Sequence, residues 1–269
     1  MTDVLARIVA DKRREVEAAQ QHSRLDELKH RASDTEPPRN FFAAVTRPRD
    51  RVRVIAEVKK ASPSAGVLRE RFDPVAIARA YHENGATAIS CLTDAKYFQG
   101  SLDDLSQIKQ AVPLPVLRKD FIIDEYQVYE ARAAGADAIL LIVECLAEAQ
   151  LLDLMILATE LKMTTLVEVY EVNNLLKVRP HIGFPHPQYT LLGINNRDLK
   201  TMKTDLNHTL RLVEMVENTD ILVSESGIKT AEDIKRLRDV GVNIILVGEH
   251  LMRHADVCAA LRKLMQAAT

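Results

Sequence analysis

From residue 52 onward the chain alternates short apolar segments with longer amphipathic ones, and this alternation limits the folds it can adopt. Short apolar runs are typical of buried strands, whereas apolar residues spaced three and four apart are typical of helices. Strands are expected at 52–59, 87–92, 115–119, 137–143, 164–169, 190–195, 220–224 and 243–247. Helices are expected after them at 73–84, 102–111, 124–134, 147–162, 171–178, 206–217, 230–240 and 255–266. Eight strand–helix units in succession predict an α/β fold with a parallel sheet.

Glycine recurs between the end of one expected helix and the start of the next strand. Gly85, Gly135 and Gly241 hold this position in three units, where glycine can end a helix in the left-handed conformation. A repeat of this kind predicts a closed (β/α)8 TIM barrel, and 269 residues suit one such domain. An open doubly wound sheet is the alternative, but no GxGxxG pattern follows the first strand.

Residues 1–50 are expected to form a helical extension packed on the barrel, with 51–269 as the barrel and a single domain overall. The spacing of Leu5, Ile8, Val9, Lys12 and Val16 predicts an amphipathic leading helix. The stretch ASDTEPPRN at 32–40 is expected to end the helical structure before a short helix at 41–45.

Composition excludes several classes of function. A net charge of -2 provides no basic field for nucleic acid or an anionic membrane. No segment approaches ~20 consecutive apolar residues and the N-terminus is charged, so neither a membrane span nor a signal peptide is expected. A cytoplasmic location follows. The three cysteines are widely spaced without a CxxC pattern, which predicts neither disulfides nor a zinc site.

Polar and charged side chains stand at the carboxyl ends of several expected strands. In the first strand Ile55, Glu57 and Lys59 share one face, because successive side chains alternate. Six such side chains fall at or near strand ends, namely Glu57, Lys59, Lys119, Glu168, Asn195 and Glu225. Any one of them has a salt-bridged structural role as its alternative. Six at the face where TIM barrels carry their active sites favour a charged pocket.

The fourth expected strand adds an apolar wall, through Leu140 and Ile142 on one face. A charged ring with an apolar wall suits an anionic substrate that carries an aromatic ring. For these two residues, plain core is an alternative of nearly equal weight.

Small residues follow the last two strands and suit phosphate. Ser226 and Gly227 follow the seventh strand and Gly248 follows the eighth. Their backbone N–H groups can approach an anion, and barrel enzymes often bind phosphate between these loops. Glycines that merely serve tight turns are the alternative.

Eight dispersed strings carry a resemblance to a known family. They are IVADKRREV, IAEVKKASPSAG, LTDAKYFQGS, VLRKDFIID, LVEV, GINNRDL, VSESGI and VGEHLMR. Together they cover nearly the whole chain, which resembles the indole-3-glycerol-phosphate synthase family of tryptophan biosynthesis.

The resemblance implies closure of an indole ring on a small phosphosugar substrate, with loss of carbon dioxide and water and without a cofactor or metal. It implies Lys119 as general acid in the condensation and Glu168 as general base in the dehydration. Lys59 would hold the substrate carboxylate or act as a second acid. The matching catalytic set is Lys119, Glu168, Lys59, Glu57, Asn195 and Ser226. The matching substrate-binding set is Ser62, Pro63, Phe98, Phe121, Leu140, Ile142, Arg197, Leu199, Glu225, Gly227 and Gly248.

Some residues depart from the family pattern or stand outside it. Ala65 replaces a common lysine, and Glu249 replaces a common small hydroxyl residue beside the expected phosphate site, where a negative charge would weaken binding unless it turns outward. His250 and His254 have i, i+4 spacing, but no further ligands accompany them and surface or packing roles are expected. The long stretch 180–189 precedes a strand, so no catalytic role is expected for it.

Two other functions remain open from the sequence. One is another phosphosugar barrel, such as a phosphoribosylanthranilate isomerase, against which Lys59, Lys119 and Glu168 argue together. The other is a catalytically silent barrel that binds phosphate ligands or a partner protein. The oligomeric state stays open between a monomer and a weak homo-oligomer.

Overall fold

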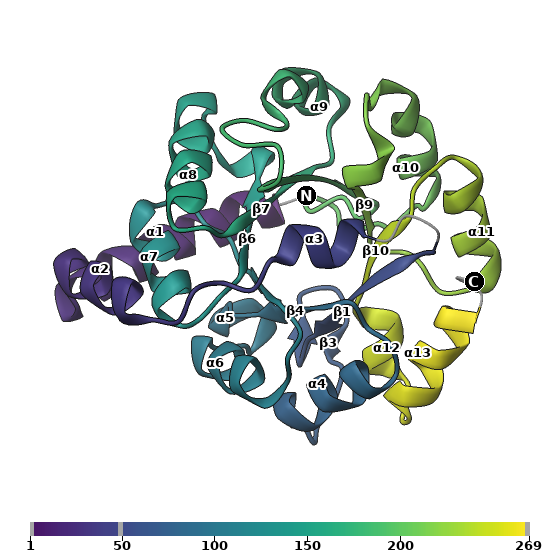
Figure 1. Ribbon diagram of the computed structural model, residues 1–269, viewed down its shortest axis with the longest axis horizontal. Helices are drawn as coiled ribbons and strands as arrows, with labels where there is room; N and C mark the ends of the chain where they lie inside the picture. The colour runs from purple at the N-terminus through teal and green to yellow at the C-terminus, as the bar shows by residue number, and fades with distance from the viewer. Residues whose placement is uncertain (1–2, 48–50, 267–269) are drawn as a thin grey trace.

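A closed barrel of parallel strands forms the centre of the computed structural model, which describes residues 3–47 and 51–266 (Figure 1). Within these residues the strands are β1 (Arg53–Val58), β4 (Ala88–Leu92), β5 (Val116–Lys119), β6 (Ala138–Ile142), β7 (Thr164–Val169), β8 (Thr190–Asn195), β9 (Leu222–Glu225) and β10 (Ile244–Val247). Each strand pairs with its neighbours in chain order, and β10 pairs with β1 to close the ring. The predicted TIM barrel is therefore confirmed, and the open sheet is excluded.

Helices surround the barrel and follow the strands in the predicted order (Figure 1). They are α4 (Pro74–Glu83), α6 (Leu102–Ala111), α7 (Glu125–Ala133), α8 (Glu148–Glu160), α9 (Val172–Val178), α10 (Asn207–Leu212), α11 (Ala231–Asp239) and α13 (Val257–Gln266). Side chains start several of them: Asp73 accepts a hydrogen bond from the N–H of Ala76, and Ser101 from that of Asp104. Gly85, Gly135 and Gly241 have φ angles of 90°, 92° and 83°, as expected for glycines that end helices.

The structure adds short elements that periodicity did not indicate. β2 (Ala61–Ser62) and β3 (Gly66–Val67) form a hairpin after β1, α5 (Ala95–Phe98) follows β4, and α12 (Glu249–Arg253) follows β10. Each is shorter than the window over which a helix or strand period can be recognised. All of them lie after the carboxyl ends of strands, in the loops that shape the site.

The strand alternation divides the core into two layers. Val54, Ala56 and Val58 of β1 face outward and pack in the large cluster shared with the surrounding helices. Ile55 faces inward. The inner cluster also contains Leu117, Leu140, Leu166, Leu191, Val223 and Leu246. The parity predicted for β1 is therefore the parity of the structure, and it directs Glu57 and Lys59 into the barrel mouth.

Within residues 3–47 three helices precede the barrel, namely α1 (Val4–His22), α2 (Leu25–Asp34) and α3 (Phe41–Thr46). The first break lies at residues 23 and 24, and helix continues to Asp34, so the break expected at 32–40 begins too early. Leu28 of α2 packs with Val16 of α1 and with Tyr126 of α7, and this tertiary packing sustains α2. The expected boundary at residues 50 and 51 adjoins 48–50, which lie outside the described residues.

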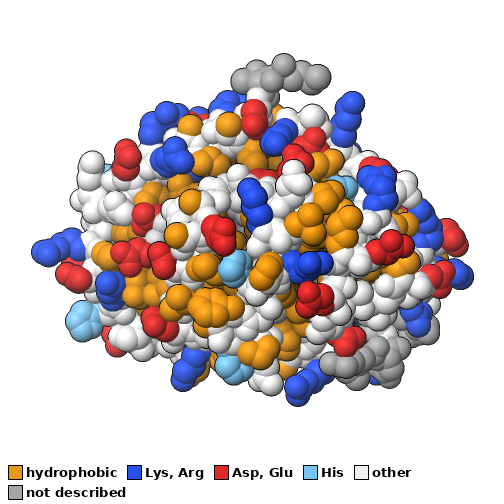
Figure 2. All heavy atoms as spheres, turned by 90° about the horizontal axis from the view of Figure 1, so that it is seen from above, with side chains coloured by type: hydrophobic (Ala, Val, Ile, Leu, Met, Phe, Trp, Pro, Cys, Tyr) orange, Lys and Arg blue, Asp and Glu red, His pale blue; other side chains and the backbone are white. Residues whose placement is uncertain are grey.

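Charge is distributed without a strong bias over the face seen in Figure 2. Lysine, arginine, aspartate and glutamate side chains are interspersed there around apolar patches. Among the described residues, no helix combines the length and the apolar character that a membrane crossing needs.

Candidate active site

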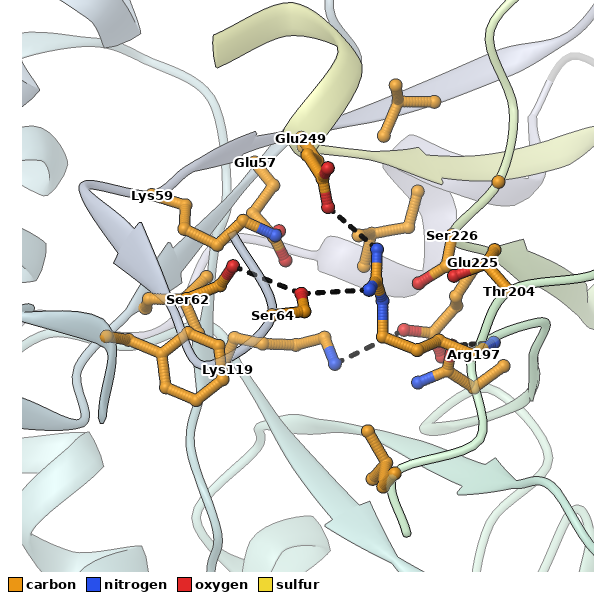
Figure 3. A pocket seen from close by; sticks show the side chains of 18 of the residues that line it. Glu57, Lys59, Ser62, Ser64, Lys119, Arg197, Thr204, Glu225, Ser226 and Glu249 are labelled. Atoms are coloured by element: carbon orange, nitrogen blue, oxygen red, sulfur yellow. Dashed lines mark hydrogen bonds and ion pairs between the residues drawn. The ribbon is translucent and has the colours of Figure 1, made fainter. Parts of the chain in front are cut away.

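A cavity of about 450 Å³ opens at the carboxyl ends of the strands (Figure 3). Its walls include most residues of the two predicted sets: Glu57, Lys59, Ser62, Pro63, Phe98, Lys119, Phe121, Leu140, Glu168, Asn195, Arg197, Leu199, Glu225, Ser226, Gly227 and Gly248. Ile142 belongs to the inner cluster and is not among these walls, so its predicted place in the substrate pocket is not that of the structure. Residues 180–189, all described, contribute no wall.

Buried charges converge at the base of the cavity. The Nζ of Lys119 lies 2.8 Å from Oε2 of Glu168 and 3.3 Å from Oε2 of Glu225. The side chain of Asn195 donates to Oε1 of Glu168 at 3.0 Å. The Nζ of Lys59 lies 2.9 Å from Oε1 of Glu57. Four different strand ends thus supply two cations and three carboxyl groups to one small volume.

The environment sets the protonation states of three of these groups. Burial lowers the pKa of Lys119, but the charges of Glu168, Glu225 and Glu57 raise it by more, so the amine stays protonated. Burial raises the pKa of Glu168, but Lys119 and Asn195 lower it below its ordinary value. The pKa of Glu225 is raised by burial and by the neighbouring charge of Glu168. The site therefore combines an ammonium, an ionised carboxylate and a second carboxyl group, that of Glu225, whose pKa lies well above its ordinary value.

Two glycines make room for the carboxyl groups. A Cβ atom on Gly193 would lie 2.3 Å from Oε1 of Glu225, and one on Gly248 would lie 2.1 Å from Oε1 of Glu57. Both distances are far shorter than any real contact, so neither position accepts a side chain without displacing an acid. Gly248 thus has a steric requirement in addition to the role predicted from the sequence.

The side of the cavity expected to bind phosphate has unusual backbone. Ser226 and Gly227 have consecutive left-handed φ angles of 67° and 80°, and the side chain of Asn196 donates to the carbonyl of Ser226 at 3.0 Å. Gly248 caps α12, whereas α11 begins only at Ala231, behind its cap Thr230. Thr204, Met202 and Lys229 also line the cavity, and the sequence offered no pattern that singled them out.

Apolar side chains line the other side. The ring centroids of Phe98 and Phe121 are 6.2 Å apart, and Pro63, Leu140 and Leu199 complete the group. Ile8 of α1 also lines the cavity. The helical period placed Ile8 on a buried face but gave no sign that this face meets the site.

Ion pairs at the rim of the cavity match the negative charge of Glu249, which departs from the family pattern. Its Oε2 accepts from a guanidinium N–H of Arg197 at 2.7 Å, and its Oε1 lies 2.9 Å from Arg253. Burial raises the pKa of Glu249, but Arg253, Arg197 and Lys59 lower it by more. Arg197 also donates to Oγ of Ser64 at 2.9 Å, which connects the β2–β3 hairpin to this pair (Figure 3). The negative charge is therefore matched by two arginines.

His250 and His254 lie on the wall of the cavity, which their isolated spacing did not indicate. Their ring centroids are 4.6 Å apart, and burial followed by the His254 charge lowers the pKa of His250. In the described ranges, no group of three or more histidine, cysteine, aspartate or glutamate side chains is arranged to hold a metal ion.

The barrel and its mouth define a TIM-barrel enzyme whose buried lysine–glutamate pair stands between an apolar wall and a glycine-rich one. The family model of indole-3-glycerol phosphate synthase matches residues 5–264, and the chain belongs to this family.

Curated relatives of that name are similar over most of the chain. The protein of Rhodopirellula baltica is 49% identical over 239 residues, which are 89% of this chain and 90% of the relative. That of Acidithiobacillus ferrooxidans is 48% identical, covering 98% of this chain and 99% of its own. Among solved structures, a 3-hexulose-6-phosphate synthase aligns with a TM-score of 0.63 and 16% identity, over 81% of this chain and all of the other. That likeness concerns the fold alone.

Proposed function

We propose that this protein converts 1-(2-carboxyphenylamino)-1-deoxyribulose 5-phosphate to indole-3-glycerol phosphate, with release of carbon dioxide and water. Its family catalyses this type of decarboxylating ring closure in tryptophan biosynthesis. The observation that carries the proposal is the buried Lys119–Glu168 pair, 2.8 Å apart, between an apolar wall and a wall suited to phosphate. Neither alternative function needs this combination.

Lys119 acts first in the proposed mechanism. The aromatic carbon that bears the carboxylate attacks the ribulose carbonyl, and the carbonyl oxygen takes a proton as the new carbon–carbon bond forms. Lys119 supplies that proton, because the carboxylates around it keep it charged. Carbon dioxide then leaves and the bonding electrons return to the ring, which restores its aromaticity.

Glu168 acts in the second half. Dehydration removes a proton from the nitrogen-bearing side of the new ring and expels the hydroxyl group as water. An ionised carboxylate serves as the base, and the lowered pKa of Glu168 keeps it ionised at neutral pH. Lys59, paired with Glu57, holds the substrate carboxylate or donates a second proton.

The remaining walls bind and orient the substrate. The aromatic ring of the substrate is proposed to lie among Phe98, Phe121, Pro63 and Leu140, whose shared apolar surface supports this position. The phosphate of the substrate is proposed to lie between the Ser226–Gly227 loop and Gly248, with Ser62 of the hairpin beside it, because all of these residues line one cavity. The polar groups between them, namely Asn195, Arg197 and Glu225, are proposed to orient the ribulose chain, and Leu199 adds to the apolar side.

A cytoplasmic location and a monomer or weak homo-oligomer belong to the same proposal. A biosynthetic family acting on a small phosphorylated metabolite supports the location. Sedimentation of the purified chain across a concentration series measures the oligomeric state.

The direct test is turnover of the carboxyphenylamino substrate, followed by the fluorescence of the indole product. Purified protein should form indole-3-glycerol phosphate without any additive. An isomerase would instead turn over phosphoribosylanthranilate, and a silent barrel would turn over neither compound.

Gly248→Asp is expected to raise the KM for substrate by ~10-fold or more, because the new carboxylate would repel a phosphate dianion a few ångströms away. Gly248→Ala is the matched control, since it crowds Glu57 in the same way but adds no charge. Inhibition by inorganic phosphate should weaken much more in the aspartate variant than in the alanine variant. Equal inhibition of both variants and the parent would place the phosphate elsewhere.

Activity is expected to be independent of metal ions, since the described residues offer no ligand cluster. Dialysis against a strong chelator should leave kcat and KM unchanged. Loss of turnover that one divalent ion restores would contradict this prediction and direct attention to His250 and His254.

A further inference from the structure

The leading helix places a charged amine deep in the molecule. Lys12 of α1 is only 1% exposed, and its Nζ lies 3.0 Å from Oδ2 of Asp94 and 3.0 Å from Oδ1 of Asp120. Glu15, one turn along the helix, accepts from the same amine at 2.9 Å. A buried charge is costly unless its partners are well arranged. Burial lowers the pKa of Lys12, but these three carboxylates raise it by more, so the amine is charged.

Each of the two barrel carboxylates that contact Lys12 accepts a backbone hydrogen bond in a loop that carries one aromatic residue of the cavity wall. Asp94 caps α5 by accepting from the N–H of Tyr97 at 2.7 Å, and α5 ends at Phe98. Asp120 accepts from the N–H of Phe121 at 2.8 Å. Lys12 therefore joins the two segments whose rings, Phe98 and Phe121, lie 6.2 Å apart.

Asp120 is also held from within the barrel. Its Oδ2 accepts from Oγ1 of Thr93 at 2.6 Å and lies 3.1 Å from Arg118. Burial raises the pKa of Asp120, but Arg118 and Lys12 lower it to about 2. Asp120 directly follows Lys119, so the network begins one residue from the proposed acid. Asp94 has no arginine of this kind, and Lys12 is its ion-pair partner in the described structure.

Lys12 itself is not part of the cavity wall, although Ile8, one turn earlier on α1, is. Helix α1 thus contacts the apolar side of the cavity directly through Ile8. One turn later, Lys12 forms ion pairs with the two loops that carry the aromatic residues. Ser226, Gly227 and Gly248, on the phosphate side, belong to loops that Lys12 does not contact.

We propose that Lys12 is a positioning residue that sets the separation of Phe98 and Phe121, and thereby fits the apolar side of the cavity to the aromatic ring of the substrate. This inference rests on the proposed function for the identity of the ring. The alternative is a purely structural role, in which Lys12 only anchors α1. The two roles differ in their expected effects on binding of the aromatic ring and on binding of the phosphate.

The test is Lys12→Met, which keeps the stem and removes the charge. The KM for substrate should rise by ~10-fold, since a displacement of about 1 Å in a site is enough for losses of this size. Inhibition by 2-aminobenzoate, which presents the ring and its carboxylate, should weaken in parallel. Inhibition by inorganic phosphate should stay within about twofold of the parent, and kcat should change less than KM.

Val16→Ala is the matched control on the same helix. Val16 is buried against Leu28 and Tyr126, so the truncation loosens α1 without touching the carboxylates. Both variants should lower the Tm, but only Lys12→Met should raise the KM. Asp94→Asn is a second, milder probe, because asparagine still caps α5 while its ion pair with Lys12 is lost. Asp94→Asn should raise the KM by a smaller factor than Lys12→Met. It keeps the proposal testable if Lys12→Met does not fold.

Three results would overturn the proposal. They are an unchanged KM in the variants that fold, an equal rise in Val16→Ala at matched Tm, and phosphate inhibition that weakens as much as aminobenzoate inhibition. A crystal structure of Lys12→Met or Asp94→Asn adds a readout independent of turnover, in which the Phe98–Phe121 separation should differ from that of the parent. If the parent fails to turn over the substrate but this separation shifts, the proposed function falls and the positioning role stands.

Discussion

Lys119→Met is expected to lower kcat by ~100-fold or more, because it removes the proposed proton donor while keeping a stem of similar length. The loss also leaves Glu168 and Glu225 without their shared cation, so the pKa of Glu168 should rise in the variant. A base that becomes protonated adds to the defect near neutral pH. Steady-state turnover, followed by indole fluorescence, measures the effect.

Lys235→Met is a suitable control for the same chemical change. Lys235 lies exposed on α11, pairs only with Asp239 among the described ion pairs and is not part of the walls of the cavity. Its turnover should match that of the parent. Circular dichroism and phosphate inhibition should show that Lys119→Met is folded and retains its anion site. Near-normal kcat in that folded variant would exclude Lys119 as the acid.

The architecture was predictable because it depends on periods that the chain repeats many times. Alternation in β1 placed Ile55, Glu57 and Lys59 on the inner face, and the structure has them there. The glycines at 85 and 135 carry their positive φ angles where a helix must end. A barrel of this kind requires little more than strands of the right parity and helices between them.

Features that depend on one distance could not be predicted in the same way. The spacing of Lys12 placed it on the apolar face of α1, but nothing in the pattern revealed Asp94 and Asp120 as its partners. The charge of Glu249 suggested a conflict with phosphate. The ion pair with Arg197 that matches this charge is a tertiary contact, and no pattern in the sequence indicated it. A sequence period gives the direction of a side chain and leaves its contacts undetermined.

The fold by itself does not determine the reaction. A 3-hexulose-6-phosphate synthase shares this architecture at only 16% identity, and TIM barrels support many reactions by varying the loops at one face. In this chain the discriminating features are the Lys119–Glu168 pair and the apolar wall beside it. Both come from strand ends and loops, and this is why substitutions there should separate the candidate functions.

Glu168→Gln is expected to lower kcat by ~100-fold or more with a smaller change in KM, because the amide keeps the shape of the side chain but accepts no proton from the ring. Its carbonyl oxygen can still accept from Lys119, so substrate binding should be less affected. Glu160→Gln, on the exposed side of α8, makes the same change away from the cavity and should leave kcat intact.

The pH profile of Glu168→Gln gives an independent check with a defined sign. The charge of Glu168 is the largest cause that raises the pKa of Lys119 in the parent, while burial opposes it. Without that charge, burial counts for more and the pKa of Lys119 should fall. The alkaline loss of the residual activity should therefore begin at lower pH than in the parent, where Lys119 keeps its proton longer. An alkaline limb that stays in place would show that Glu168 does not maintain the charge of Lys119. Turnover close to that of the parent would show that Glu168 is not the base.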